Sequence, residues 1–180
     1  MAFDWYEICA TGDNTLNQGD FIPECPIVIP PLQLAEGDDD VEIEVQKIDS
    51  IILSQSCDLQ HGKLNIVLVC PYNPLSVWLD DLPADQQSRK ARTKAIDNLR
   101  KGNIPAYHLL NKSNNGMLAD YQVVDFRNVY GINFQLLRKI VENMRSRIRL
   151  LPPYREHLSQ AFARHFMRVG LPQDISVEGY

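Results

Sequence analysis

The chain has 180 residues, of which 44% are hydrophobic and 23% charged, and its formal net charge is −5. This length and composition fit one globular domain, so we expect a single folded unit over residues 1–180 without a long disordered stretch. Residues 1–10 lack the basic start and apolar core of a signal peptide, and no run approaches the roughly 18 apolar residues of a membrane span. We therefore expect a cytoplasmic protein that does not enter a membrane.

Acidic and basic residues are separated along the chain. Residues 1–60 contain thirteen Asp and Glu but one basic residue, Lys47. Between residues 138 and 168 the balance reverses, with eight Arg and Lys against Glu142 and Glu156. Such a separation is an argument about contacts rather than about fold. Either the two poles face each other, or the basic half meets an anionic partner.

Residues 1–75 read mostly as β-structure. Residues 20–31 contain apolar pieces broken by four prolines, which is typical of an edge strand or of an irregular one. Residues 41–46 alternate between polar and apolar side chains, as a half-buried strand does. Residues 64–70 are apolar on both faces, which predicts a central strand. Antiparallel strands at this spacing indicate a small twisted sheet or a barrel.

Helices alternate with strands in the rest of the chain. Residues 83–101 predict a largely polar outer helix, bounded by a proline and a glycine. Residues 104–126 predict two strands joined by a polar turn. Residues 133–170 read as helical, with one helix from Asn133 to about Arg147 and the clearest helix after it. The fold class is therefore α+β, with a small twisted antiparallel sheet or SH3-like β-barrel, appended helices and a helical C-terminal segment.

Two stretches of the chain have a recognisable sequence. Residues 53–59 read LSQSCDL, and residues 153–172 read PYREHLSQAFARHFMRVGLP. Together they resemble a widespread group of small uncharacterised bacterial proteins. This resemblance spans most of the chain and implies no particular activity.

A second resemblance covers residues 19–71. Gly19 and Asp20, followed by the strands around residues 51–54 and 67–71, are similar in order to the barrel of PemK/MazF-type toxins, which are often ribonucleases. The resemblance implies a PemK-like barrel and a bacterial defence or toxin-type setting. Where that family has an Arg before its second strand, this chain has Asp49 and an acidic surrounding. Carboxylates cannot neutralise the charge that develops on a phosphate without a metal, so we expect the barrel shape without the ribonuclease chemistry.

Cys57, Asp58 and His61 form the most site-like cluster, because they lie at a strand end beside a predicted turn. A Cys with a nearby His can act as an activated nucleophile. Zinc is another use of these atoms, since Cys57 and His61 with Cys25 or Cys70 would supply three or four ligands. The structural alternative is a buried Cys57 and an Asp58 that caps the turn, with no cofactor.

Four acidic residues lie near predicted strand ends, where they would hold a divalent cation for phosphodiester chemistry: Asp20, Glu24, Asp58 and Asp125. The alternative is that they are turn and cap residues on an acidic surface.

Six basic residues of the C-terminal half are predicted to bind an anionic partner: Arg145, Arg147, Arg149, His157, Arg164 and Arg168. Arginine forks onto phosphate and carboxylate groups, so we expect weak, salt-sensitive binding of nucleic acid. In the alternative interpretation these arginines pair with the acidic half of the chain.

The sequence as a whole favours a non-catalytic binding or adaptor module whose partner is a protein or a nucleic acid. The enzymatic alternative is a metal-dependent nuclease or a cysteine hydrolase centred on Cys57, Asp58 and His61. The oligomeric state is left open.

Overall fold

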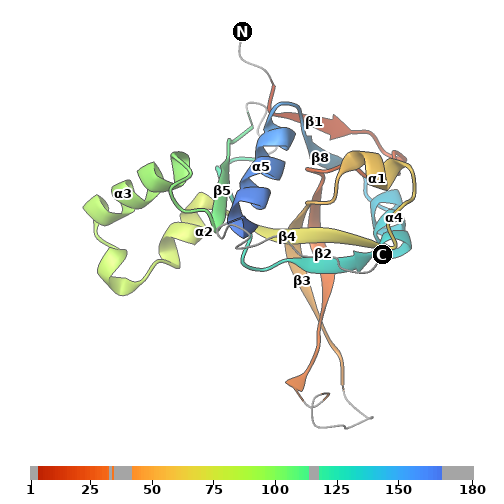
Figure 1. Cartoon of the computed structure of the whole chain (residues 1–180), viewed down its shortest axis with the longest axis horizontal. Helices are drawn as coiled ribbons and strands as arrows, with labels where there is room; N and C mark the ends of the chain where they lie inside the picture. The colour runs from red at the N-terminus through yellow and green to blue at the C-terminus, as the bar shows by residue number, and fades with distance from the viewer. Residues whose placement is uncertain (1–3, 33, 35–41, 114–117, 168–180) are drawn as a thin grey trace, which may run out of the picture.

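The computed structural model describes residues 4–32, 34, 42–113 and 118–167, which form an α+β fold (Figure 1). In chain order the elements are β1 (Tyr6–Cys9), β2 (Phe21–Ile29), β3 (Glu44–Ile52), α1 (Ser56–Gln60), β4 (Ile66–Pro74), α2 (Leu75–Asp80), α3 (Arg89–Arg100), β5 (Tyr107–Leu110), β6 (Gln122–Asp125), β7 (Tyr130–Asn133), α4 (Phe134–Glu142), β8 (Arg147–Leu150) and α5 (Tyr154–Phe166). A short 3-10 turn, Ala84–Gln86, precedes α3. None of the helices in this described part combines the length and the apolar character that crossing a bilayer requires.

The main sheet is antiparallel and open. Its strand order is β2-β3-β4-β6-β5, and β7 also pairs with β4. On one side β4 pairs with β3, while on the other side residues 66–69 pair with β7 and residues 72–74 with β6. β7 and β6 thus pair with different parts of the same edge of β4. The β5–β6 hairpin therefore lies at the end of the sheet opposite to β2. Among the described strands, β2 and β5 at the two ends of the sheet do not pair with each other, so the sheet does not close. The predicted SH3-like or PemK-like barrel is therefore not formed.

Several elements expected from the sequence are confirmed. The proline-rich β2 is an edge strand, and β4 lies inside the sheet. The two strands expected within residues 104–126 are β5 and β6, which pair antiparallel. The last helix is α5, and its expected end at Gly170 lies outside the described residues.

Alternating side chains give the sheet two apolar faces. On β3, Ile51 packs in a cluster with Leu158 of α5, whereas the next residue, Ile52, packs with Leu59 of α1 and Leu137 of α4. All five are buried. Since successive side chains of a strand point to opposite faces, α5 covers one face of the sheet while α1 and α4 cover the other.

The prediction of a helical segment over residues 133–170 is wrong in its middle. Asn133 does cap α4, because its side chain accepts hydrogen bonds from the backbone N–H groups of Gln135 and Leu136. However, α4 ends at Glu142, and Arg147–Leu150 forms β8, which pairs antiparallel with β1. The alternating sequence Arg-Ile-Arg-Leu is compatible with a strand here because its arginines find carboxylates inside the protein.

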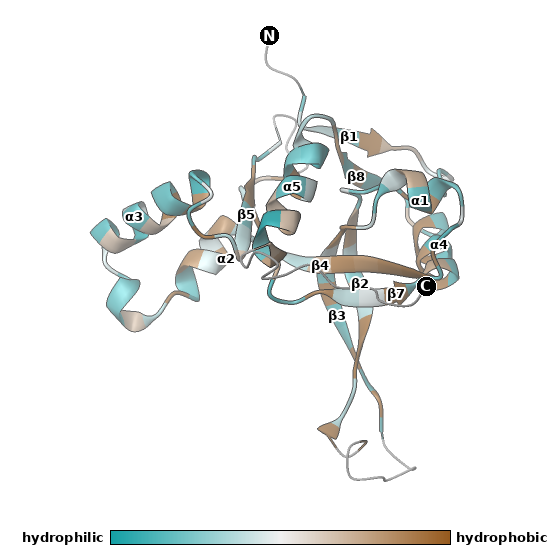
Figure 2. Cartoon of the chain, viewed as in Figure 1, coloured by the Kyte–Doolittle hydropathy of each residue, from teal (hydrophilic) through white to brown (hydrophobic). Residues whose placement is uncertain are grey.

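The predicted outer helix begins later than expected. Ser88 caps α3 by accepting a hydrogen bond from the backbone N–H of Ala91 at 3.2 Å. Leu99 is the buried residue of this helix and packs with Trp78 of α2 and Val123 of β6. The rest of α3 is largely hydrophilic (Figure 2), as its sequence predicted. Only one side of α3 is therefore anchored to the body of the protein.

Candidate functional site

Asp20 joins the acidic first half of the chain to the basic second half inside the protein. Its buried carboxylate accepts hydrogen bonds from Nε of Arg147 at 2.9 Å and from Nε of Arg149 at 2.5 Å. The backbone N–H of Asn17 donates to it at 3.1 Å. The side chains of Arg147 and Arg149 are only 2% and 12% exposed. Both guanidinium groups therefore face an internal carboxylate rather than a partner.

Further carboxylates surround the same arginines. Nη1 of Arg149 lies 3.5 Å from Glu7 and 3.7 Å from Asp13. Burial opposes the charge of Arg149, but the hydrogen bond and the charge of Asp20 outweigh burial, so the pKa of Arg149 is raised above its ordinary value. At this place in the structure, acidic residues of the first half of the chain therefore pair with the basic residues Arg147 and Arg149 of the second half.

The four acidic residues considered for a divalent cation do not gather. Each has its own basic neighbour: Asp20 with Arg147, Asp58 with Lys63, Asp125 with Arg127, and Glu24 with Lys47. Within the described residues no group of three or more His, Cys, Asp or Glu side chains is arranged to hold a metal ion.

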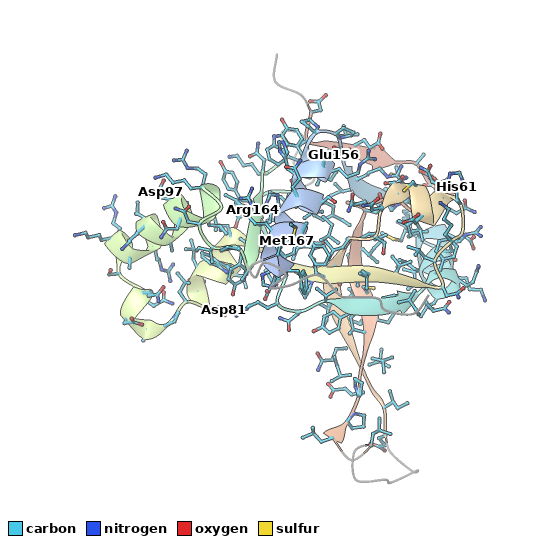
Figure 3. The ribbon with its side chains drawn as sticks, viewed as in Figure 1. His61, Asp81, Asp97, Glu156, Arg164 and Met167 are labelled. Atoms are coloured by element: carbon cyan, nitrogen blue, oxygen red, sulfur yellow. The ribbon has the colours of Figure 1, made fainter. Side chains whose placement is uncertain are left out.

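Cys57, Asp58 and His61 lie close in sequence on and just after α1, but they do not form a joined site. The exposed Cys57 thiol lies 3.8 Å from Oε1 of Gln55, and in the described part of the chain it has no hydrogen bond to Asp58 or His61. Figure 3 shows His61 at the end of α1 that lies away from α5. Cys25, the third predicted zinc ligand, is buried in β2, and burial raises its pKa to about 11. Within the described residues, Cys25, Cys57 and His61 are not grouped as the ligands of one metal ion would be.

A pocket of about 300 Å³ lies between the C-terminal end of α3, strand β5 and one flank of α5. We call it the basic cleft, after the five basic side chains in its lining: Arg100, Lys101, His108, His157 and Arg164. No Asp or Glu of the described residues lines it. Tyr107, Leu99 and Leu109 contribute aromatic and apolar surface. The cleft thus combines positive charge with a partly apolar wall.

Helix geometry and a glycine turn bring these charges together. The residues that α5 contributes recur at intervals of three and four, and so share one face of the helix: His157, Gln160, Ala161 and Arg164. Gly102 ends α3 with a φ of +68°, which favours glycine. A Cβ on Gly102 would lie 3.7 Å from Nη1 of Arg164. The turn therefore places Arg100 and Lys101 beside Arg164.

The basic cleft keeps an excess of positive charge. Arg100 and Lys101 share one carboxylate, Asp97, at 3.0 and 2.5 Å. Asp97 is half-exposed on α3 and does not line the cleft. Among the described residues no carboxylate pairs with Arg164, which lies on α5 beside α3 in Figure 3. One cation at least is therefore available to an anionic ligand.

His108 is a half-buried titratable group of the basic cleft. Its ring lies 6.4 Å from that of Phe126. Burial, and after it the charges of His157 and Arg164, lowers the pKa of His108 to about 4. His108 is thus uncharged at neutral pH, when its ring has both a donor and an acceptor nitrogen.

Two of the six predicted anion-binding residues, His157 and Arg164, meet in the basic cleft. The other four lie elsewhere: Arg147 and Arg149 with Asp20, Arg145 exposed in the loop between α4 and β8, and Arg168 outside the described residues. Three further residues of the cleft, Arg100, Lys101 and His108, were not predicted from the sequence. The available signal was a basic pair directly before the glycine that ends a helix.

A second pocket, of about 370 Å³, lies between α1 and the other flank of α5. We call it the Cys57 pocket, and its lining is polar: Gln18, Gln55, Ser56, Cys57, Arg155, Glu156, Ser159 and Gln160. Seven of these eight residues come from the two stretches LSQSCDL and PYREHLSQ, which are far apart in the sequence. Gln160 lines both pockets, so α5 separates two adjoining cavities.

No family model matches the chain, and neither a curated protein nor a solved structure matches it.

Proposed function

We propose that this protein is a non-catalytic binding module that takes single-stranded nucleic acid in the basic cleft. The observation that carries this proposal is the lining of the cleft, which has the cations Arg100, Lys101 and Arg164, two histidines and, among the described residues, no carboxylate. Phosphate oxygens are the usual partners of such a lining, because Arg and Lys donate charge-assisted hydrogen bonds to them. The toxin- or defence-type setting that the resemblance of residues 19–71 implies belongs to the same proposal.

The size of the basic cleft favours a single strand over a duplex. Its volume of about 300 Å³ is at the lower end of the range for small-molecule sites, which a nucleotide fits and a double helix does not. Proteins that bind single strands combine a positive groove with aromatic and apolar surface. Tyr107 and Leu109 provide such surface next to the charges.

The arginines that do not face the cleft limit the affinity that we expect. Arg147 and Arg149 form ion pairs with Asp20 and do not face the cleft. Phosphate contacts in the cleft can therefore come from three cations, Arg100, Lys101 and Arg164. Three contacts to a single strand correspond to a slope of about −2 in a plot of log affinity against log salt concentration. Binding should therefore be weak and salt-sensitive.

The test is fluorescence anisotropy of a labelled twelve-nucleotide single strand, as DNA and as RNA, titrated with protein at several salt concentrations. Arg164→Glu should weaken binding about tenfold or more and make the salt slope shallower, because it replaces a phosphate contact with a repulsive charge. Lys90→Glu is the matched control, since it makes the same charge change on exposed α3 outside the cleft.

Two outcomes would reject the proposal. The first is that Arg164→Glu binds the oligonucleotide as Lys90→Glu does, which removes the cleft as the site. The second is that polyglutamate displaces the oligonucleotide at equal concentration of charge, which would assign the cleft to an acidic protein segment instead.

A further inference from the structure

The Cys57 pocket differs from the basic cleft in its chemistry. The two charged residues in its lining neutralise each other, because Nη2 of Arg155 lies 2.9 Å from Oε1 of Glu156. The remaining polar groups are neutral amides and hydroxyls, contributed by Gln18, Gln55, Gln160, Ser56 and Ser159, together with the thiol of Cys57. A ligand here meets donors and acceptors without a net charge. This suits a neutral polar ring with its own donors and acceptors better than it suits a phosphate.

One wall of the Cys57 pocket is held in place by hydrogen bonds. The backbone N–H of Gln18 donates to Oγ of Ser56 at 3.1 Å, and Nε2 of Gln18 donates to the carbonyl oxygen of Leu53 at 2.6 Å. Gln18 is buried, whereas Gln55 is exposed at the mouth of the pocket. The wall is therefore fixed before a ligand arrives, which lowers the entropic cost of binding.

The two pockets are close enough for one ligand to occupy both. They share Gln160, and they lie on adjacent flanks of α5: residues 157, 160, 161 and 164 face the basic cleft, and residues 155, 156, 159 and 160 face the Cys57 pocket. A helix with its side chains is about 10–12 Å across. A short oligonucleotide spans this distance, with its phosphates on one side of α5 and a base on the other.

We propose that the Cys57 pocket is a nucleobase subsite, which receives a base from the strand whose phosphates lie in the basic cleft; this inference rests on the function proposed above. Gln side chains form paired hydrogen bonds with base edges, and single strands expose those edges once the bases are unstacked. The basic cleft then provides affinity without regard to sequence, and the Cys57 pocket provides a preference among bases.

The thiol of Cys57 reports occupancy of this pocket in the unmodified protein. Cys57 is exposed, whereas the other three cysteines, Cys9, Cys25 and Cys70, are buried. Burial raises the pKa of Cys9 and of Cys25 to about 11 and raises that of Cys70 further. Iodoacetamide at neutral pH should therefore alkylate Cys57 selectively, and the rate can be followed by mass spectrometry.

Twelve-nucleotide homopolymers of dA, dC and dT, at concentrations that saturate the anisotropy signal, should slow the alkylation of Cys57 at least about fivefold for the preferred base. Inorganic phosphate, which fills only the basic cleft, should leave the rate unchanged. An unchanged rate with a saturating oligonucleotide overturns the nucleobase subsite and leaves the proposed function intact. Absence of binding by anisotropy rejects both.

A substitution at the mouth of the pocket provides the second readout. Gln55→Leu should change the ratio of affinities among the three homopolymers by about tenfold, the size of one paired base contact, without altering the salt slope. Gln135→Leu, the same change on exposed α4 outside both pockets, is the control. Equal ratios in Gln55→Leu and Gln135→Leu contradict the inference.

Discussion

Asp20→Asn removes one negative charge from the buried junction between β2 and β8. In the folded protein this carboxylate is fully buried and is bound by Arg147 and Arg149. The two guanidinium groups also donate to the backbone carbonyls of Asp13 and Thr15, so they cannot turn towards water without losing further hydrogen bonds. The substitution therefore leaves positive charge inside the protein without its main counter-charge.

The expected cost follows from that burial. Removing one partner of a buried ion pair lowers the free energy of unfolding by about 3–5 kcal/mol, because the remaining charge is desolvated and uncompensated. For a chain of this length each kcal/mol lowers Tm by about 2–4 °C, so Tm should fall by roughly 6–20 °C. Since domains are stable by about 5–15 kcal/mol, Asp20→Asn retains little of its stability margin.

The assay is urea unfolding followed by circular dichroism at low and high salt. Asp97→Asn is the control, because this carboxylate also has two cationic neighbours, Arg100 and Lys101, but its side chain is 42% exposed and its ion pairs are screened by solvent. The control should change stability little, and added salt should not reduce the difference between the two variants. If Asp20→Asn unfolds at the same urea concentration as Asp97→Asn, the argument that the buried charges join the two halves is refuted.

Three further predictions concern single positions. His108 has a folded pKa of about 4 against an ordinary value of 6.5, so the unfolded chain takes up its proton first. The contribution of His108 to the free energy of unfolding should be constant above pH 6.5 and fall by about 3 kcal/mol as the pH drops from 6.5 to 4. In urea titrations across that pH range, His108→Gln should therefore show a smaller loss of stability than the unmodified protein. Gly19→Ala should lower stability by about 2 kcal/mol or more, measured by thermal unfolding, because φ is +82° and the new Cβ would lie 2.8 Å from Cβ of Leu150. Ser88→Ala should cost about 1 kcal/mol through loss of the α3 cap, and a loss of several kcal/mol would contradict the view that only one side of α3 is anchored.

Local sequence signals predicted those elements whose cause is local. The prolines of β2 identified an edge strand, the two-sided apolar run of β4 identified an inner strand, and Asn133 identified the start of α4. Each of these depends on a dihedral preference, a missing N–H or a nearby side chain. Such causes act within a few residues.

The elements that the sequence did not predict depend on distant partners. The segment of β8 was predicted to be part of a helical stretch, with Arg147 and Arg149 in a basic patch. Asp20, 127 residues from Arg147, compensates the charge of a buried strand there. The basic cleft likewise needs α3 to turn at Gly102 towards Arg164 of α5. Periodicity shows which side of a helix is polar, but it does not show which other element that side will meet.

The buried charges and the candidate site are connected through the order of elements along the chain. β8 pairs with β1 and leads directly into α5, and at that junction the N–H of Leu151 donates to the carbonyl of Trp5 at 2.8 Å. The ring of Trp5 then stacks on Tyr154, the first residue of α5, at a centroid distance of 3.6 Å. Because α5 carries one wall of each pocket, the contact of Asp20 with β8 also sets where those walls begin. A buried ion pair contributes little net stability over an apolar core, so we expect its main effect here to be on the position of β8.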